Sequence, residues 1–299
     1  MSDPGFRCGF IAIAGRPNVG KSTLVNALVG NKISIVSPKP QTTRGRLLGI
    51  LKRERSQLIF VDTPGIHAGG RRALNRRMNR AASSAIADAD MVLLMVEGTQ
   101  WRDQDDRILR QCVASGRPVG LLINKIDTLE SRDQLLPFLE NLKDKADFIF
   151  MIPISARSGD NIDDLVRTIE RHLPESPPLF PVEQVTDQTQ IFRAGELVRE
   201  QLMLQLQQEV PYSIAVQIEE FRDEPKLVKI SATIWVEREG QKAIVIGHQG
   251  AMLKKIGRCA RLELEKAFGK KVYLQLWVKV RENWSDDERA LQQLGIEDT

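Results

Sequence analysis

The sequence predicts an α/β fold in its first half, with a mostly parallel six-stranded sheet, and a smaller α+β domain in its second half. Residues 10–172 alternate short aliphatic runs with longer amphipathic ones, a pattern typical of strands covered by helices on both faces. After a proline-rich stretch at residues 173–188, the pattern changes to alternating strands and two helices separated by glycines.

Six aliphatic runs predict the strands of the first domain, and helices are expected between most of them. The second and third runs are separated only by a short polar turn, so we expect them to form an antiparallel hairpin within an otherwise parallel sheet. The strand candidates are FIAIAG, LLGILKR, LIFVDTPG, MVLLMVEG, VGLLINKID and FIFMIPISA, and the helices are expected at residues 22–30, 71–88, 103–115, 132–145 and 161–172.

The second half predicts the order helix, strand, strand, helix, helix, strand. A helix is expected at residues 193–208, strands in YSIAVQIEEF, KLVKISATIWVER and KVYLQLWVKVR, and helices in QKAIVIG and GAMLKKIGRCARLELEKAF. The stretch SDDE at 285–288 predicts a capping box for a short terminal helix. We therefore expect domains at residues 1–174 and 191–282, a linker at 175–190 and a tail at 283–299.

Composition excludes few functions. The 299 residues carry 43 Lys and Arg against 39 Asp and Glu, a basic excess too small to indicate nucleic acid by itself. The three cysteines, Cys8, Cys112 and Cys259, have no metal-binding spacing and are expected to be reduced thiols. No signal region and no apolar run near 20 residues is present, so we expect a cytoplasmic protein, which leaves peripheral contact with the inner membrane possible.

The stretch GRPNVGKS fits the phosphate-binding pattern G-x-x-x-x-G-K-[ST] between a strand and a helix. Gly15 and Gly20 let the backbone N–H groups face phosphate oxygens. Lys21 is expected to bridge the β- and γ-phosphates, and the Ser22 hydroxyl to bind Mg²⁺. The rest of the predicted nucleotide-binding loop comprises Arg16, Pro17, Asn18, Val19 and Thr23.

The stretch NKID predicts a site that selects guanine over adenine. The Asp127 carboxylate can accept hydrogen bonds from guanine N1–H and the 2-amino group, neither of which adenine offers. Asn124 is expected at the purine edge and Lys125 over the ring. Ser155 and Ala156 end the next strand, where backbone N–H groups can reach the guanine carbonyl.

Two further stretches predict sensors of the γ-phosphate. In DTPG, Asp62 is expected to hold Mg²⁺ through water and Gly65 N–H to meet the γ-phosphate, with Thr63 and Pro64 between them. In QTTR we expect Thr43, rather than Thr42, to bind Mg²⁺. Lys21, Thr43 and Gly65 are thus the predicted catalytic residues, which act through charge and position.

With these four motifs the chain resembles translation-factor-type GTPases of the Ras-like fold. The resemblance implies two loops that γ-phosphate orders, here residues 35–45 and 63–72. Many such GTPases have a glutamine after DxxG to orient the attacking water. This chain has Ile66 there, whose aliphatic side chain cannot hydrogen-bond water, so we expect slow intrinsic turnover. The neighbouring His67 either orients the water or is an ordinary loop residue. By the same resemblance Asn18 either helps to bind K⁺ or only shapes its loop.

The second domain resembles a type II KH domain. Gly247, His248, Gln249 and Gly250 form a G-x-x-G loop between two helices, and Lys254, Lys255 and Arg258 follow where they can meet phosphates. KH loops usually have a basic residue between the glycines, which is absent here. Ile244, Ile246 and Leu253 either line an apolar groove for bases or belong to the core, and we expect the core for at least one.

Two other features leave alternatives open. Arg72, Arg76 and Arg80 recur at four-residue steps on one predicted helix face, where either acidic neighbours or RNA phosphates offset their repulsion. Trp277 points away from the apolar face of its strand, and we favour a role in covering the outer sheet over stacking on a base.

Over nearly the whole chain, including EREGQKAIVIG and LWVKVRENWSDDERALQQLG, the sequence resembles the Era family of GTPases. The resemblance implies a monomer that binds the 3′ tail of small-subunit ribosomal RNA, acts in small ribosomal subunit assembly and couples GTP to RNA binding. The alternatives are a tRNA-modifying GTPase, whose family has a cysteine-containing tail where this chain has LGIEDT, and an RNA-binding scaffold that holds GTP without turnover.

Overall fold

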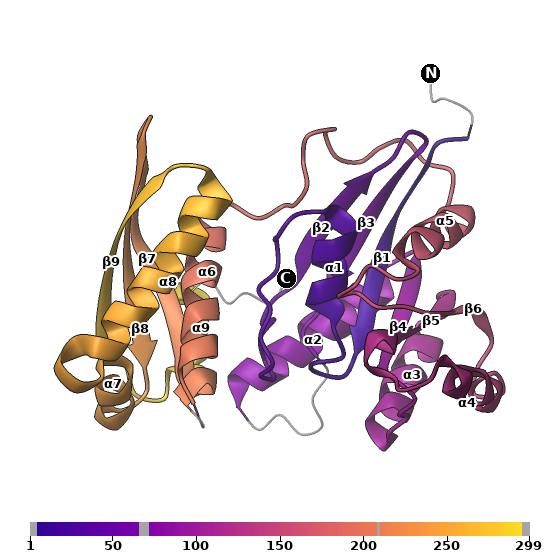
Figure 1. Cartoon of the computed structure of the whole chain (residues 1–299), viewed down its shortest axis with the longest axis horizontal. Helices are drawn as coiled ribbons and strands as arrows, with labels where there is room; N and C mark the ends of the chain where they lie inside the picture. The colour runs from indigo at the N-terminus through magenta and orange to yellow at the C-terminus, as the bar shows by residue number, and fades with distance from the viewer. Residues whose placement is uncertain (1–4, 66–71, 208–209, 295–299) are drawn as a thin grey trace.

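The computed structural model describes residues 5–65, 72–207 and 210–294. Two domains lie side by side, joined by a long connection (Figure 1). The first contains a six-stranded sheet in the order β2-β3-β1-β4-β5-β6, in which only β2 and β3 are antiparallel, as predicted. The strands are β1 (Arg7–Gly15), β2 (Leu47–Lys52), β3 (Ser56–Asp62), β4 (Met91–Glu97), β5 (Val119–Asn124) and β6 (Phe148–Pro153).

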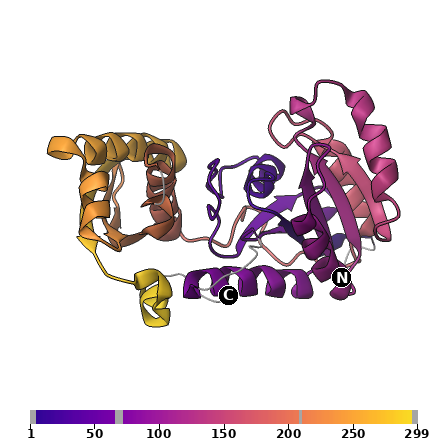
Figure 2. The same ribbon diagram turned by 90° about the horizontal axis from the view of Figure 1, so that it is seen from below.

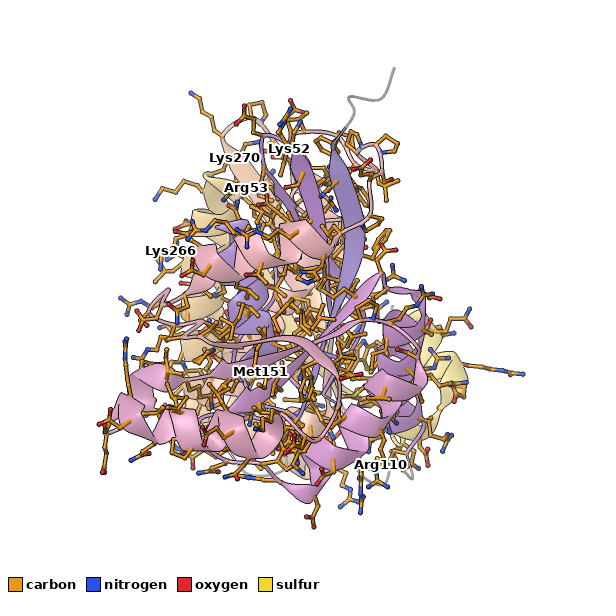
Figure 3. All side chains as sticks on the ribbon, turned by 90° about the vertical axis from the view of Figure 1, so that its right-hand side faces the viewer. Lys52, Arg53, Arg110, Met151, Lys266 and Lys270 are labelled. Atoms are coloured by element: carbon orange, nitrogen blue, oxygen red, sulfur yellow. The ribbon has the colours of Figure 1, made fainter. Side chains whose placement is uncertain are left out.

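Helices cover both faces of this sheet. Helices α1 (Lys21–Val29) and α5 (Ile162–His172) pack on one face, and α2 (Ala73–Asp88), α3 (Asp103–Ala114) and α4 (Leu135–Leu142) on the other. Alternate residues of β1 enter the two cores, with Ile11 and Ile13 on one side and Ala12 and Ala14 on the other. Charged side chains such as Lys52, Arg53 and Arg110 project from the outside of this domain (Figure 3).

The fourth helix is shorter than the predicted 132–145. Residues Arg132–Gln134 form a 3-10 turn, and α4 begins only at Leu135. Pro137 explains this start, because proline lacks an N–H and is accommodated in the first turn of a helix. A second 3-10 turn, Ile126–Thr128, follows β5.

The connection between the domains is held along the edge of the sheet. Ile50 N–H donates to the carbonyl of Val185 at 2.9 Å, and Gly49 forms an antiparallel bridge with Thr186. Earlier in the same connection, the N–H groups of Leu179 and Phe180 donate to the side-chain oxygen of the buried Gln57 at 2.8 and 3.0 Å. The proline-rich stretch is therefore a strap fixed to the outer side of β2 and β3.

The second domain has the predicted order of elements. Its sheet runs β7-β8-β9, with β7 and β8 antiparallel and β8 and β9 parallel, and its helices pack on one face. The elements are α6 (Gln190–Gln205), β7 (Ile214–Asp223), β8 (Leu227–Val236), α7 (Glu239–Ile246), α8 (Ala251–Phe268) and β9 (Lys271–Val280), with 3-10 turns at Val210–Ser213 and His248–Gly250.

The tail forms a 3-10 turn at Trp284–Asp286 and the helix α9 (Glu288–Gln293). The predicted capping box is wrong: Asp287 caps this helix by accepting from Arg289 N–H at 2.9 Å, while the Ser285 hydroxyl donates to Glu237 instead. Helix α9 lies beside the N-terminal end of α2 (Figure 2). There the buried Trp284 packs with apolar residues from both domains, namely Ala73, Leu74, Met78, Ala215, Ala290 and Leu291.

Candidate functional site

The phosphate-binding loop joins β1 to α1 and packs closely against residues of β4 and β5. A Cβ on Gly20 would lie 2.2 Å from the Asn124 amide nitrogen, and one on Gly15 would lie 2.6 Å from the Met95 carbonyl oxygen. Both positions therefore require glycine. Lys21 folds back over the loop, where its ammonium donates to the carbonyls of Gly15 and Arg16 at 3.0 Å each.

A buried ion pair fixes the middle of this loop. The Arg16 guanidinium donates to Asp105 at 2.7 Å, and the two side chains are 5% and 0% exposed. The second Asp105 oxygen accepts from Arg102 N–H at 2.9 Å, so the same carboxylate also caps α3. The loop is thus anchored to a helix 89 residues farther along the chain.

Burial lowers the pKa of Lys21. Removal from water lowers the pKa of this ammonium to about 8, an effect that the nearby Arg16 charge strengthens and the Asp62 carboxylate partly offsets. Two phosphate groups beside the ammonium would favour its charged form and raise this pKa again.

Nucleotide affinity is therefore expected to depend on pH. Below a pKa of about 8 the free protein already carries the Lys21 ammonium, whereas above it binding must take up a proton. We expect GDP affinity to fall about threefold between about pH 7.5 and 8.5. Isothermal titration calorimetry at about pH 8.5 in two buffers of different ionisation enthalpy measures the proton uptake; a heat of binding that is the same in both buffers contradicts the prediction.

Four oxygen-bearing side chains meet beside the phosphate loop. Asp62, which is fully buried, accepts at one carboxylate oxygen from the hydroxyls of Ser22 and Ser34, both at 2.8 Å, and from that of Thr43 at 3.4 Å. Ser22 and Thr43 are themselves 2.9 Å apart. The other Asp62 oxygen is buried without a hydrogen-bond partner in the described part of the chain. An all-oxygen donor set with a free carboxylate oxygen fits Mg²⁺.

The two threonines of QTTR have different surroundings. Thr43 faces this magnesium-type cluster, whereas the Thr42 hydroxyl bonds Ser37 at 2.7 Å and the Lys39 carbonyl at 2.7 Å. Thr63 is buried and donates to the Ile13 carbonyl at 2.7 Å, and Gly65 lies so close to Pro17 that a Cβ would approach it to 2.8 Å. Ile66 and His67 lie outside the described residues.

The base-reading residues are held together by hydrogen bonds within the protein. The buried Asn124 amide donates to the Val19 carbonyl at 2.7 Å and accepts from Ala156 N–H at 2.9 Å. Asn124 thus links the phosphate loop to the base-reading loop, and its contact with the purine edge stays a prediction. Asp127 is exposed, and one of its oxygens accepts from the Ser155 hydroxyl at 2.7 Å.

A cavity of about 460 Å³, a size suitable for a nucleotide, lies over the phosphate loop and the loop that carries Thr43. Of the base-reading residues only Lys125 lines it; Asn124, Asp127, Ser155 and Ala156 do not. The Lys125 ammonium, at its edge, pairs with Glu97 at 2.6 Å. Arg157, which the motifs do not identify, also lines it. The predicted residues on its wall are Pro17, Asn18, Gly20, Lys21, Ser22, Thr23, Thr43, Gly65 and Lys125.

The G-x-x-G loop of the second domain is shaped by its glycines. Gly247 has φ 73° and a Cβ there would lie 2.7 Å from the Met252 Cβ, whereas Gly250 has φ 79° with open space around it. His248 and Gln249 are exposed. Beyond the loop Lys254, Lys255 and Arg258 are exposed on α8, and none of them has an ion-pair partner within 5–65, 72–207 and 210–294.

Apolar side chains beside this loop divide between surface and core. Ile244 is 49% exposed, and Ile246 is half-buried. Leu253 packs against the domain core, as expected for at least one of the three. Trp277 is 42% exposed on the outer face of β9.

Acidic neighbours offset the arginine row on α2. Glu288 of α9 lies 3.7 Å from Arg76 and 3.9 Å from Arg80, and Glu237 lies 4.0 Å from Arg72. Arg77, one residue off the row, makes the shortest of these contacts, 2.7 Å to Glu288. Arg76, Arg77 and Arg80 therefore link α2 to the tail, and Arg72 links it to the second domain.

Among the helices of the described residues, none has the length and apolar character required to cross a membrane.

Comparison with known proteins identifies both domains. Residues 10–125 match the family model of 50S ribosome-binding GTPases, and residues 209–285 match that of the KH domain. The chain is 53% identical to GTPase Era of Stenotrophomonas maltophilia over 97% of both chains. It is 51% identical to GTPase Era of Coxiella burnetii, over 97% of this chain and 98% of that one.

Two solved Era structures match this chain over both of its domains. The structure of an Aquifex aeolicus Era variant bound to GDP and AlF4⁻ matches with a TM-score of 0.94 and 41% identity, over 97% of this chain and 99% of that one. The structure of Era in complex with MgGDPNP and nucleotides 1506–1542 of 16S ribosomal RNA matches with a TM-score of 0.95, also at 41% identity and with the same coverage. The chain belongs to the Era family of GTPases.

Proposed function

We propose that this protein is a GTP-hydrolysing switch that binds the 3′ end of small-subunit ribosomal RNA and acts in assembly of the small ribosomal subunit. The observation that carries the proposal is the contact between the loop bearing Thr43 and the KH domain, since it joins the nucleotide site to the RNA-binding domain. The related Era that binds MgGDPNP and 16S ribosomal RNA supports the choice of RNA.

In the hydrolysis step, water attacks the γ-phosphorus of GTP and the bond to the bridging oxygen of the β-phosphate breaks, which gives GDP and inorganic phosphate. The Lys21 ammonium and the backbone N–H groups of the loop bind the phosphates, and Gly65 N–H binds the γ-phosphate. Ser22, Thr43 and, through water, Asp62 hold Mg²⁺, which neutralises phosphate charge when bound. Asp127, Lys125 and Ser155 select guanine. Asn124 meets the purine edge and also keeps the base-reading loop fixed to the phosphate loop.

In the KH domain the RNA strand approaches the loop formed by Gly247, His248, Gln249 and Gly250, where little side chain stands in its way. Lys254, Lys255 and Arg258 contact phosphates. Ile246, half-buried next to the loop, contacts bases together with the exposed Ile244. We assign the nucleotide-binding domain to residues 1–174, the linker to 175–190, the KH domain to 191–282 and the tail to 283–299.

The remaining assignments concern ions and surroundings. Asn18 donates through its amide nitrogen to the Pro38 carbonyl at 2.8 Å, which leaves its amide oxygen available to a K⁺ ion at the phosphates. We place the protein in the cytoplasm as a monomer that binds the small subunit. Peripheral contact with the inner membrane stays a prediction of the sequence alone.

Phosphate release measured with and without small ribosomal subunits tests this function. We expect slow release by the protein alone and a faster rate with subunits. Parallel reactions in KCl and NaCl test the K⁺ assignment, which predicts the faster rate in KCl. No release under any of these conditions would favour the alternative of a scaffold that holds GTP. Release that responds to tRNA but not to subunits would favour the tRNA-modification alternative.

A further inference from the structure

The loop that carries Thr43 is fastened to the KH domain along its length. The Glu200 carboxylate on α6 accepts from Val36 N–H at 3.0 Å and from the Lys32 ammonium at 2.5 Å. The Lys39 ammonium donates to carbonyls at the end of the same helix. The Glu200 side chain is only 3% exposed, whereas its Lys32 partner is 40% exposed, so the buried carboxylate holds the loop from the protein side of a partly exposed ion pair.

The two residues that flank Thr43 are both held by the KH domain. Arg199 donates through its guanidinium to the Thr42 carbonyl. On the other side, Arg44 donates to the carbonyls of Ile214 at 2.5 Å and Tyr212 at 3.1 Å. Adjacent Cα atoms are about 3.8 Å apart, so fixing both neighbours fixes the backbone from which the Thr43 hydroxyl reaches the magnesium-type cluster.

The Arg199 guanidinium is held in one orientation by a neighbouring carboxylate. Its guanidinium meets both oxygens of Glu196, one turn earlier on α6, at 2.7 and 2.6 Å. Such a two-point bond orients the planar group and aims the same Nη2 nitrogen at the Thr42 carbonyl. Arg199 is 4% exposed, and one of its guanidinium nitrogens is buried without a hydrogen-bond partner among the described residues. Burying an unpaired N–H group costs free energy, and an arginine that only made a surface contact would not have to bear that cost.

We propose that Arg199 and Glu200 of the KH domain are positioning residues for Thr43, so that the RNA-binding domain completes the GTP-bound form of the nucleotide site. This inference rests on the proposed function, in which Thr43 senses the γ-phosphate. GDP lacks that phosphate and does not need Thr43 in place. The KH contacts therefore stabilise GTP binding and hydrolysis and contribute little to GDP binding.

The test compares Arg199→Ala, Glu200→Gln and Thr43→Val in the full chain. We expect Arg199→Ala to weaken binding of a non-hydrolysable GTP analogue in Mg²⁺ and to lower kcat, each about tenfold, while GDP affinity changes less than about twofold. Glu200→Gln keeps an acceptor for Val36 N–H but loses the Lys32 charge pair, so a smaller loss is expected. Arg199→Lys keeps the charge without the two-point bond and should restore only part of the analogue affinity.

Two controls make the outcome decisive. Arg193→Ala removes an arginine of the same helix that makes no side-chain bond with the described residues, and it should leave analogue and GDP affinities unchanged. Combining Arg199→Ala with Thr43→Val should give no further loss beyond Thr43→Val, because both changes remove the same interaction. Equal losses of GDP and analogue affinity, or additive effects in the double variant, would overturn the inference. If the wild-type protein neither binds the analogue nor hydrolyses GTP, the proposed function itself fails.

Discussion

Replacing Asp127 by Asn is expected to shift the protein from guanine to xanthine nucleotides. The carboxylate lies exposed after β5, and the Ser155 hydroxyl holds one of its oxygens at 2.7 Å. In the variant, the amide N–H of the asparagine would face an N–H donor of guanine, so one hydrogen bond would be lost. Xanthine has a carbonyl in place of the 2-amino group, and this carbonyl can accept from the asparagine N–H. The expected change in preference is about 10⁴-fold, as in other sites where a missing hydrogen bond decides selection.

Competition between GDP and XDP for the full chain measures this shift. Asp163→Asn is a matched control, because it removes the same charge from an exposed position in the first turn of α5. That control should keep the preference for GDP. If Asp127→Asn also keeps it, Asp127 does not read the base.

Replacing Gly250 by Asp is expected to abolish most RNA binding while nucleotide binding stays intact. The new carboxylate would face RNA phosphates, and the left-handed backbone at φ 79° adds about 1–2 kcal/mol of strain. We expect affinity for an RNA of the small-subunit 3′ end to fall at least tenfold at moderate salt. Changing both loop glycines is a poorer test, because a side chain at Gly247 would collide with Met252 and disturb the start of α8.

Gly269 provides the control for this prediction. It ends the same helix with a similar φ of 65°, and a Cβ there would also meet open space. Gly269→Asp therefore adds the same charge and a comparable strain at the other end of α8. Equal RNA affinities for the two variants, measured over a series of salt concentrations, would refute the role of the loop.

The sequence predicts most of the fold because its patterns are long and locally consistent. Alternating aliphatic runs mark every strand, and the order of elements in both domains is confirmed. Errors occur where a single local bond decides an element's end. Pro137 delays the start of α4, and Asp287 caps α9 in place of the expected Ser285.

The candidate site also contains residues that the sequence identifies and residues that it does not. Phosphate- and base-reading residues lie in contiguous motifs, so their types and spacing identify them. Ser34, Glu97 and Arg157 also contribute to the site or its cavity wall, but they carry no such signal. The contacts of Glu200 and Arg44 to the other domain span 164 to 170 residues, and no local pattern in the chain can indicate a pairing at that separation.

The strap along β2 has a consequence for where the chain can be divided. Strand β2 is the outermost strand of its sheet, and Val185 and Thr186 occupy backbone groups that would otherwise be open to pairing with another chain. A fragment ending at 174 would leave this edge bare and prone to self-association, whereas one that continues through 187 would carry its own cover. The stretch between the domains thus serves as a built-in guard against aggregation of the first domain.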